Sequence, residues 1–199
     1  MDPNARRELL ENAYEESDRL NQIVGNLLDM TRVETGLLQL SKKLCDLSDV
    51  IGVSLQQIPK ERLGKHPIEI HIPPEFPEIL IDLSLMMKTF MNILDNALKY
   101  SPADARVRID ARIVDDRVRI EFTDQGIGIP PKDLGRIFDK FFRSEHHPTV
   151  PGTGLGLAIC KGIVEAHQGE LLAESRLGEG TRLIVSLPLS HTPDKDNAK

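Results

Sequence analysis

The chain has 199 residues, and the 40% that are hydrophobic suffice for the core of one domain with an appendage or of two small domains. Its formal net charge of −6 argues against a nucleic-acid surface, because a phosphate backbone attracts an excess of Lys and Arg. The apolar runs are far shorter than the roughly 18 residues of a membrane-spanning helix, and no signal peptide is visible, so we expect a cytoplasmic chain without membrane contact of its own.

The only two cysteines, Cys45 and Cys160, lie far apart and outside any metal-ligand spacing. We expect both to be free thiols in a reducing compartment.

The first predicted element is one long helix over residues 4–38, which contains no internal proline. Apolar residues recur in alternating steps of four and three, with Glu16 as the exception; the positions are Leu9, Ala13, Leu20, Ile23, Leu27 and Met30. Leu10, Val24 and Leu28 widen this stripe. We expect the helix to pack in a bundle or dimer; the alternative is a core helix of its own domain.

Short helices and strands follow in alternation. The pattern predicts a strand at 42–46, a helix at 47–63, a half-buried strand around 68–72, a brief strand at 78–81 and a helix capped by Asp82. Two alternating runs at 105–114 and 117–124, joined by Asp115 and Asp116, predict a β-hairpin.

The C-terminal part predicts a short helix with an aromatic cluster at 130–143, a polar loop at 144–152 and a helix at 153–167. Strands at 170–175 and 180–187 and a disordered tail at 191–199 complete the chain. This order predicts an α+β fold, a two-layer α/β sandwich with helices on one face of a mixed sheet, preceded by a long helix.

A polar stripe lies on the helix after Asp82. Asn92, Asn96 and Lys99 are spaced by four and three residues and therefore share one helix face. Oxygen ligands suit Mg²⁺, which keeps several waters, so such a face fits a metal ion and phosphates. The alternative is an ordinary solvated face.

The segment DQGIGIP begins with Asp124 at a strand end. Its carboxylate can accept a hydrogen bond from an exocyclic amine, and Gly126 and Gly128 leave room for a planar base. Ile127, Ile129 and Phe138 could supply apolar walls for the base. In isolation the segment could also be a turn that ends a hairpin.

A second glycine-rich segment, GTGLG at 152–156, opens a helix, where backbone N–H groups form an anion site. It is neither a Walker loop nor a Rossmann fingerprint.

In this order the segments NILDNALKYSP, DQGIGIP and PGTGLGLAI resemble the nucleotide site of histidine-kinase ATPase domains, in the superfamily of gyrase, Hsp90 and MutL. The resemblance covers roughly residues 47–189 and implies the Bergerat fold with ATP and Mg²⁺ as ligands. It implies that Asn96 binds Mg²⁺ with Asn92 nearby, that Lys99 and Tyr100 line the phosphate side, and that Asp124 reads the adenine amine. The remaining implied contacts are Gly126, Gly128, Ile129, Phe138, Arg143, Gly152, Thr153, Gly154, Leu155, Gly156 and Thr181. Phe138, Phe141, Phe142 and Arg143 match the aromatic segment that anchors a lid over ATP.

Asn92 bears on the reaction. Superfamily members that hydrolyse ATP carry Glu at the matching position, and an amide cannot serve as a general base. We therefore expect phosphoryl transfer with Asn92, Asn96 and Lys99 as catalytic residues. A self-contained ATPase and a non-catalytic ATP-binding module are the alternatives.

None of the six histidines lies in the H-[ED]-x-[RK]-x-P-L context of a phosphoacceptor. The first helix instead resembles the second helix of a dimerising hairpin, so we expect an incomplete hairpin at 1–40, a catalytic domain at 41–190 and a tail at 191–199. The expected partners are the phosphoacceptor helix of the same kinase in a homodimer and a response regulator, with the full-length protein membrane-anchored. The segments NLLDMTRVETG and PGTGLGLAICKGIVEAHQGEL resemble the potassium-responsive Kdp-type sensor kinases.

Overall fold

The computed structural model describes residues 2–36, 38–64, 66–144 and 152–189. Its centre is a five-stranded sheet in the order β2-β4-β5-β7-β6. Only the β2–β4 pair is parallel, so the sheet is mixed, as predicted. The strands are β2 (Ile68–His71), β4 (Val107–Val114), β5 (Arg117–Asp124), β6 (Glu170–Arg176) and β7 (Gly180–Pro188).

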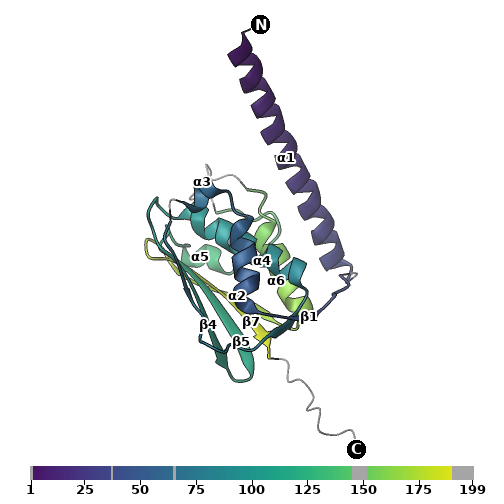
Figure 1. Ribbon diagram of the computed structural model, residues 1–199, viewed down its shortest axis with the longest axis vertical. Coiled ribbons are helices and arrows are strands. Elements are labelled where there is room, and N and C mark those ends of the chain that lie inside the picture. Colours follow the sequence, from purple (N-terminus) through teal and green to yellow (C-terminus); the bar gives the residue numbers. More distant parts are fainter. Residues whose placement is uncertain (1, 37, 65, 145–151, 190–199) are drawn as a thin grey trace, which may run out of the picture.

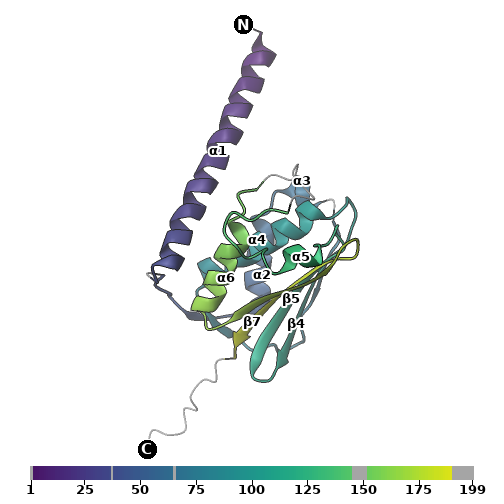
Figure 2. The same ribbon diagram turned by 180° about the vertical axis from the view of Figure 1, so that it is seen from behind.

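Three helices cover one face of this sheet, which confirms the predicted two-layer sandwich (Figures 1 and 2). They are α2 (Leu47–Gln56), α4 (Leu83–Tyr100) and α6 (Gly156–Ala166); α3 (Lys60–Leu63) and α5 (Pro131–Leu134) are short. A separate two-stranded sheet joins β1 (Lys43–Cys45) to β3 (Ile79–Ile81). In the described parts of the chain, no helix combines the length and apolarity needed to span a bilayer.

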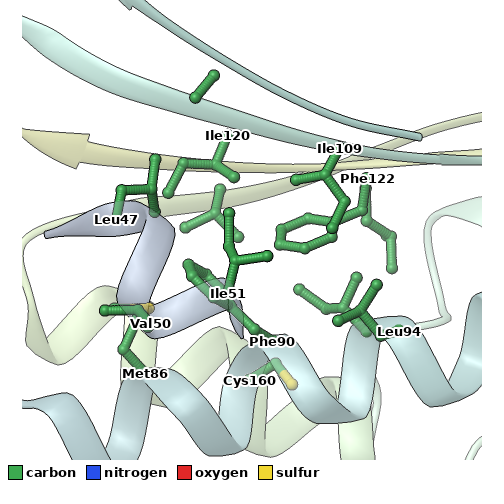
Figure 3. Close-up of a cluster of buried hydrophobic side chains, with 14 of the residues drawn as sticks. Leu47, Val50, Ile51, Met86, Phe90, Leu94, Ile109, Ile120, Phe122 and Cys160 are labelled. Carbon is green, nitrogen blue, oxygen red and sulfur yellow. The ribbon is translucent and has the colours of Figure 1, made fainter. Parts of the chain in front are cut away.

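The main core lies between the sheet and helices α2 and α4 (Figure 3). Phe90 of α4 and Phe122 of β5 meet with ring centroids 5.1 Å apart. Because α4 turns its apolar face inward, Asn92 and Asn96 lie half-buried at its flank. Both cysteines are free, as predicted, and complete burial raises the pKa of the Cys160 thiol to about 12.

The β-hairpin prediction is confirmed, since Asp115 and Asp116 adopt φ values of 48° and 57° in a two-residue turn between β4 and β5. The single helix predicted at 47–63 is wrong. It is split into α2 and α3 because Pro59 cannot continue a helix, and the N-cap is Asp46, whose side chain accepts from the Ser48 and Asp49 amides. The predicted loop at 144–152 and the tail at 191–199 lie largely or wholly outside the described residues.

Helix α1 (Pro3–Glu34) extends away from the sandwich and meets it only near its C-terminal end (Figures 1 and 2). There Met30, 8% exposed, packs with Leu155, Ala158, Ile159 and Ile163 of the α6 region. Acidic side chains of α1 reinforce the contact, because Asp29 pairs with Lys88 and Glu34 with Lys140. Seven large apolar residues nearer the N-terminus remain exposed: Leu9, Leu10, Tyr14, Leu20, Val24, Leu27 and Leu28.

Candidate functional site

The polar flank of α4 faces the start of α6. Asn92 Oδ1 lies 3.5 Å from the position that a Cβ on Gly156 would occupy, so the two predicted segments meet here. The Asn92 Nδ2 atom is buried without a hydrogen bond of normal geometry among the described residues, but the Asn92 side chain interacts with the buried Cys160 thiol and opposes the rise of its pKa.

Lys99, two turns beyond Asn92 on α4, pairs with Asp95 one turn before it. The Asp95 carboxylate pairs with both Lys99 and Arg62. Arg62 pairs with Oδ1 and Lys99 with Oδ2, so both oxygens of this carboxylate are engaged in ion pairs. Lys99 thus stands at the predicted phosphate side, tethered by an ion pair within its own helix.

Asp124 ends β5 and turns back on its own loop. Its Oδ1 atom accepts hydrogen bonds from the backbone amides of Gly126 at 2.8 Å and Thr181 at 3.1 Å. Burial raises the pKa of this carboxyl, while the two amides oppose that shift. Oδ2 accepts no hydrogen bond from any described residue, so one carboxylate oxygen is available to a ligand.

Glycines bring three chain segments into close contact around Asp124. A Cβ on Gly126 would lie 2.6 Å from the carbonyl oxygen of Tyr100, at the end of α4. Gly128 has a φ of 69°, and a Cβ there would lie 1.9 Å from the carbonyl oxygen of Arg176 in β6. The end of α4, the loop after β5 and the β6–β7 turn therefore form one unit, which only glycine permits.

The position of the GTGLG segment is fixed by Gly154 and by the packing of Leu155 against α1. Gly154 has a φ of 72°, and a Cβ there would lie 2.7 Å from the carbonyl carbon of Phe141. The Thr153 hydroxyl accepts from the Leu155 amide at 3.3 Å. The Leu155 side chain is buried against α1, so of this residue only the backbone could face a ligand. Gly152 is exposed at the edge of the described chain.

The predicted aromatic cluster is spread out rather than packed together. Phe138 packs against the main core, with Lys161 Nζ 5.7 Å from its ring centroid. Phe142 stacks under the Arg136 guanidinium at 4.5 Å, while Phe141 is 65% exposed. The segment is therefore anchored by Phe138 and Phe142 and not by all three rings.

Tyr100 and Arg143 are electrostatic neighbours at the end of α4. Burial raises the pKa of Tyr100, and the Arg143 guanidinium opposes that shift. Arg143 is itself exposed. It stands beside the predicted phosphate-side residues of α4.

One residue of this region was missed from the sequence. Ser175 of β6 lies opposite Thr181 in the β6–β7 pairing, and its hydroxyl accepts from the Ile129 amide at 2.8 Å. It also bonds to Thr181 Oγ1 and the Gly180 carbonyl. The signal available was the hairpin register, which places Ser175 across the turn from Thr181.

Comparison with known proteins decides the family. The model of the histidine kinase-, DNA gyrase B-, and HSP90-like ATPases matches residues 81–191, more than half of the chain. The chain belongs to this ATPase family.

Curated relatives of this ATPase domain are sensor proteins. The chain is 38% identical over 173 residues to sensor protein KdpD of Escherichia coli K12, and the match covers 87% of the chain and 19% of KdpD. It is 33% identical over 183 residues to the alginate biosynthesis sensor protein KinB of Pseudomonas aeruginosa, covering 92% of the chain and 30% of KinB. The chain thus spans about a fifth to a third of the length of these relatives.

Solved structures of sensor kinases share the fold. The mycobacterial sensor histidine kinase MprB is 33% identical with a TM-score of 0.65, over 74% of this chain and 97% of that one. Full-length ShkA in complex with AMPPNP is 26% identical with a TM-score of 0.81, over 92% of this chain and 38% of that one.

The donor set of the ATPase domain fits a nucleotide-bound Mg²⁺ better than a metal held by protein alone. Among the described residues no group of three or more His, Cys, Asp or Glu side chains could hold a metal ion. The side chain of Asn96 is half-buried and makes no hydrogen bond within the described ranges. One amide oxygen with phosphate oxygens and waters is a set that Mg²⁺ accepts.

Proposed function

We propose that this chain is the ATP-binding catalytic domain of a two-component sensor histidine kinase. It would transfer the γ-phosphoryl group of Mg-ATP to an imidazole nitrogen of a histidine outside this sequence. In that reaction the bond between the γ-phosphorus and the bridging oxygen of ADP breaks, and a P–N bond forms. Positioning and charge neutralisation would supply most of the catalysis.

The observation that carries the proposal is the meeting of the three predicted segments. Tyr100 contacts Gly126, and Asn92 contacts Gly156, so the polar flank of α4 stands between the two glycine-rich loops. An ATP with its base at Asp124 and its phosphates at the GTGLG backbone would cross this flank. Sensor-kinase relatives over nearly the whole chain support the same proposal.

Each residue then has a role. Asp124 Oδ2 would accept from the adenine amine, with Gly126, Gly128, Ile129 and Thr181 around the base. Lys99, Tyr100 and Arg143 would line the phosphates, and the N–H groups of residues 152–156 would bind them. Asn96 would coordinate Mg²⁺, which neutralises phosphate charge when bound, and Asn92 would support it. Phe138 would anchor the lid.

Helix α1 would belong to the dimerising hairpin, with 41–190 as the catalytic domain. The exposed apolar residues of α1 would be buried by a partner helix. Each such side chain that is buried contributes about 1.5–3 kcal/mol to stability. We infer a homodimer in which the phosphoacceptor helix covers the exposed apolar residues of α1. A response regulator would then receive the phosphoryl group. The domain would act in the cytoplasm as part of a membrane-anchored protein.

We also propose the Kdp-type grouping, on the 38% identity to KdpD against 33% to KinB. A KdpD chimera with this chain in place of its matching region tests it. Potassium-dependent signalling by this chimera would support the grouping, and its loss with kinase activity intact would contradict it.

The central test is incubation with γ-labelled Mg-ATP, with and without a phosphoacceptor hairpin from a close relative supplied in trans. Label on the added hairpin alone would support a kinase domain. Release of free phosphate without any labelled protein would favour the self-contained ATPase and overturn the argument from Asn92. ATP binding with neither product would favour a non-catalytic module.

A further inference from the structure

The Ser175 hydroxyl, on β6, bonds to two other segments at the base end of the site. It accepts from the Ile129 amide at 2.8 Å, donates to the Gly180 carbonyl at 2.7 Å and lies 3.0 Å from Thr181 Oγ1. It therefore bonds both to the loop after β5 and to the first two residues of β7.

These three bonds use every hydrogen-bonding position of a hydroxyl. A serine hydroxyl has one proton and two lone pairs. The carbonyl of Gly180 can only accept, so it takes the Ser175 proton; the Ile129 amide occupies one lone pair. The bond to Thr181 must then run from Thr181 to Ser175. With its proton committed, Thr181 Oγ1 presents only lone pairs to anything else.

Thr181 stands directly beside Asp124, because its own amide donates to Asp124 Oδ1 at 3.1 Å. An ionised carboxylate is also an acceptor without a proton. The Asp124 carboxylate and the Thr181 hydroxyl, both at the base end of the site, thus offer only hydrogen-bond acceptors. The Thr181 hydroxyl does so because its proton is bonded to Ser175.

We propose that Ser175 is a positioning residue that fixes the Thr181 hydroxyl as an acceptor and so favours bases with an exocyclic amine over bases with a carbonyl there. The inference rests on the proposed nucleotide function and extends it to the choice of base. Adenine would meet acceptors with its amine, whereas the 6-oxo group of hypoxanthine would meet lone pairs and stay unpaired. In Ser175→Ala the Thr181 proton is released and can serve the 6-oxo group.

The test compares the dissociation constants of ATP and inosine triphosphate by calorimetry, on the whole chain with Mg²⁺. We expect Ser175→Ala to lower the preference for ATP about tenfold, mainly by tighter inosine triphosphate binding, and Ser175→Thr to restore it. Thr181→Val, which removes the acceptor but keeps the shape, should also lower the preference. In the Thr181→Val background, Ser175→Ala should change the ratio no further, because the two act as one pair.

A purely structural role for Ser175 would weaken both nucleotides equally and shift the melting temperature without changing the ratio. An unchanged ratio in Ser175→Ala, or an equal drop with and without Thr181, overturns the inference. Should Ser175→Ala fold poorly, an unchanged ratio in Thr181→Val overturns it alone. Failure of the unaltered chain to bind ATP would instead overturn the proposed function, and this inference with it.

Discussion

The imidazole of His167 accepts, through Nε2, a hydrogen bond from the backbone amide of Asp82 at 2.9 Å. Its Nδ1 faces the Ile163 carbonyl at 2.8 Å, so Nδ1 carries the proton and Nε2 does not. The ring is 2% exposed and connects the C-cap of α6 to Asp82, the N-cap of α4. A protonated imidazolium would place an N–H against the Asp82 N–H, so the folded state requires the neutral ring.

This arrangement predicts that the protein loses stability below neutral pH. Burial lowers the pKa of His167. Below about pH 6.5 this imidazole therefore binds a proton in the unfolded chain but stays neutral in the folded chain. Stability is therefore complete above that pH and falls as the pH drops, by up to about 1.4 kcal/mol per unit for one group. Urea unfolding between pH 8 and pH 5 measures the slope. In His167→Gln the slope should become shallower; an identical slope would contradict the prediction.

The Asp82 carboxylate adds to this dependence at lower pH. Burial alone would raise its pKa, but hydrogen bonds from Ser84, Ser41 and Leu85 together lower it. A lowered carboxyl pKa stabilises the fold above about pH 3.9 and stops doing so as the pH falls through the folded value.

Replacing Asp124 by Asn should remove most ATP affinity and leave the fold intact. The new amide would keep an oxygen toward Gly126 and Thr181 and turn its NH₂ toward the adenine amine, placing donor against donor. Loss of a charged hydrogen bond costs about 1.5–3 kcal/mol, or roughly 10- to 100-fold in the dissociation constant. Calorimetric titration with ATP measures it. Asp110 is a carboxylate on β4 that pairs with His71 and Arg108. Asp110→Asn is therefore the control and should bind ATP as the unaltered chain does.

Much of the fold was predictable because its strands, turns and helix starts follow from local sequence patterns. Alternation defined β4 and β5, the Asp115-Asp116 pair defined their turn, and Asp82 defined the start of α4. Helix faces were equally readable, so the polar flank at Asn92 and Asn96 was found. Pro59, which divides α2 from α3, was an available signal that the continuous apolar pattern outweighed.

Contacts between distant segments were less accessible. Ser175 has no motif of its own, and its importance comes from bonds to Ile129 and Gly180 that only the folded hairpin brings together. Leu155 was expected at the nucleotide as part of the GTGLG backbone; the folded chain adds that its side chain packs against Met30, where α1 docks. Periodicity in a helix gives the direction of an apolar face but not the surface that covers it.

Gly128→Ala should destabilise the domain and weaken nucleotide binding. The φ of 69° strains any other residue, and the added Cβ would lie 1.9 Å from the carbonyl oxygen of Arg176. We expect a loss of at least about 2 kcal/mol in the free energy of unfolding. Gly52→Ala is the matched control: it lies within α2 with no atom within 4 Å of the new Cβ, so it should gain about 0.5–1 kcal/mol. Equal urea midpoints for the two variants would be incompatible with this account.

The docking of α1 on α6 depends on Gly162, because a Cβ there would lie 2.1 Å from Val33 Cγ1. Gly162→Ala should therefore push α1 off the sandwich and expose Met30, which amide hydrogen exchange of residues 29–34 would detect as faster exchange. Val33→Ala in the same chain should restore slow exchange, since it removes the methyl groups that clash. Gly25→Ala, in a part of α1 where nothing lies within 4 Å of the new Cβ, should leave the exchange of residues 29–34 unchanged. Exchange in Gly162→Ala that stays as slow as in the unaltered chain would show that the helix interface can absorb the added carbon.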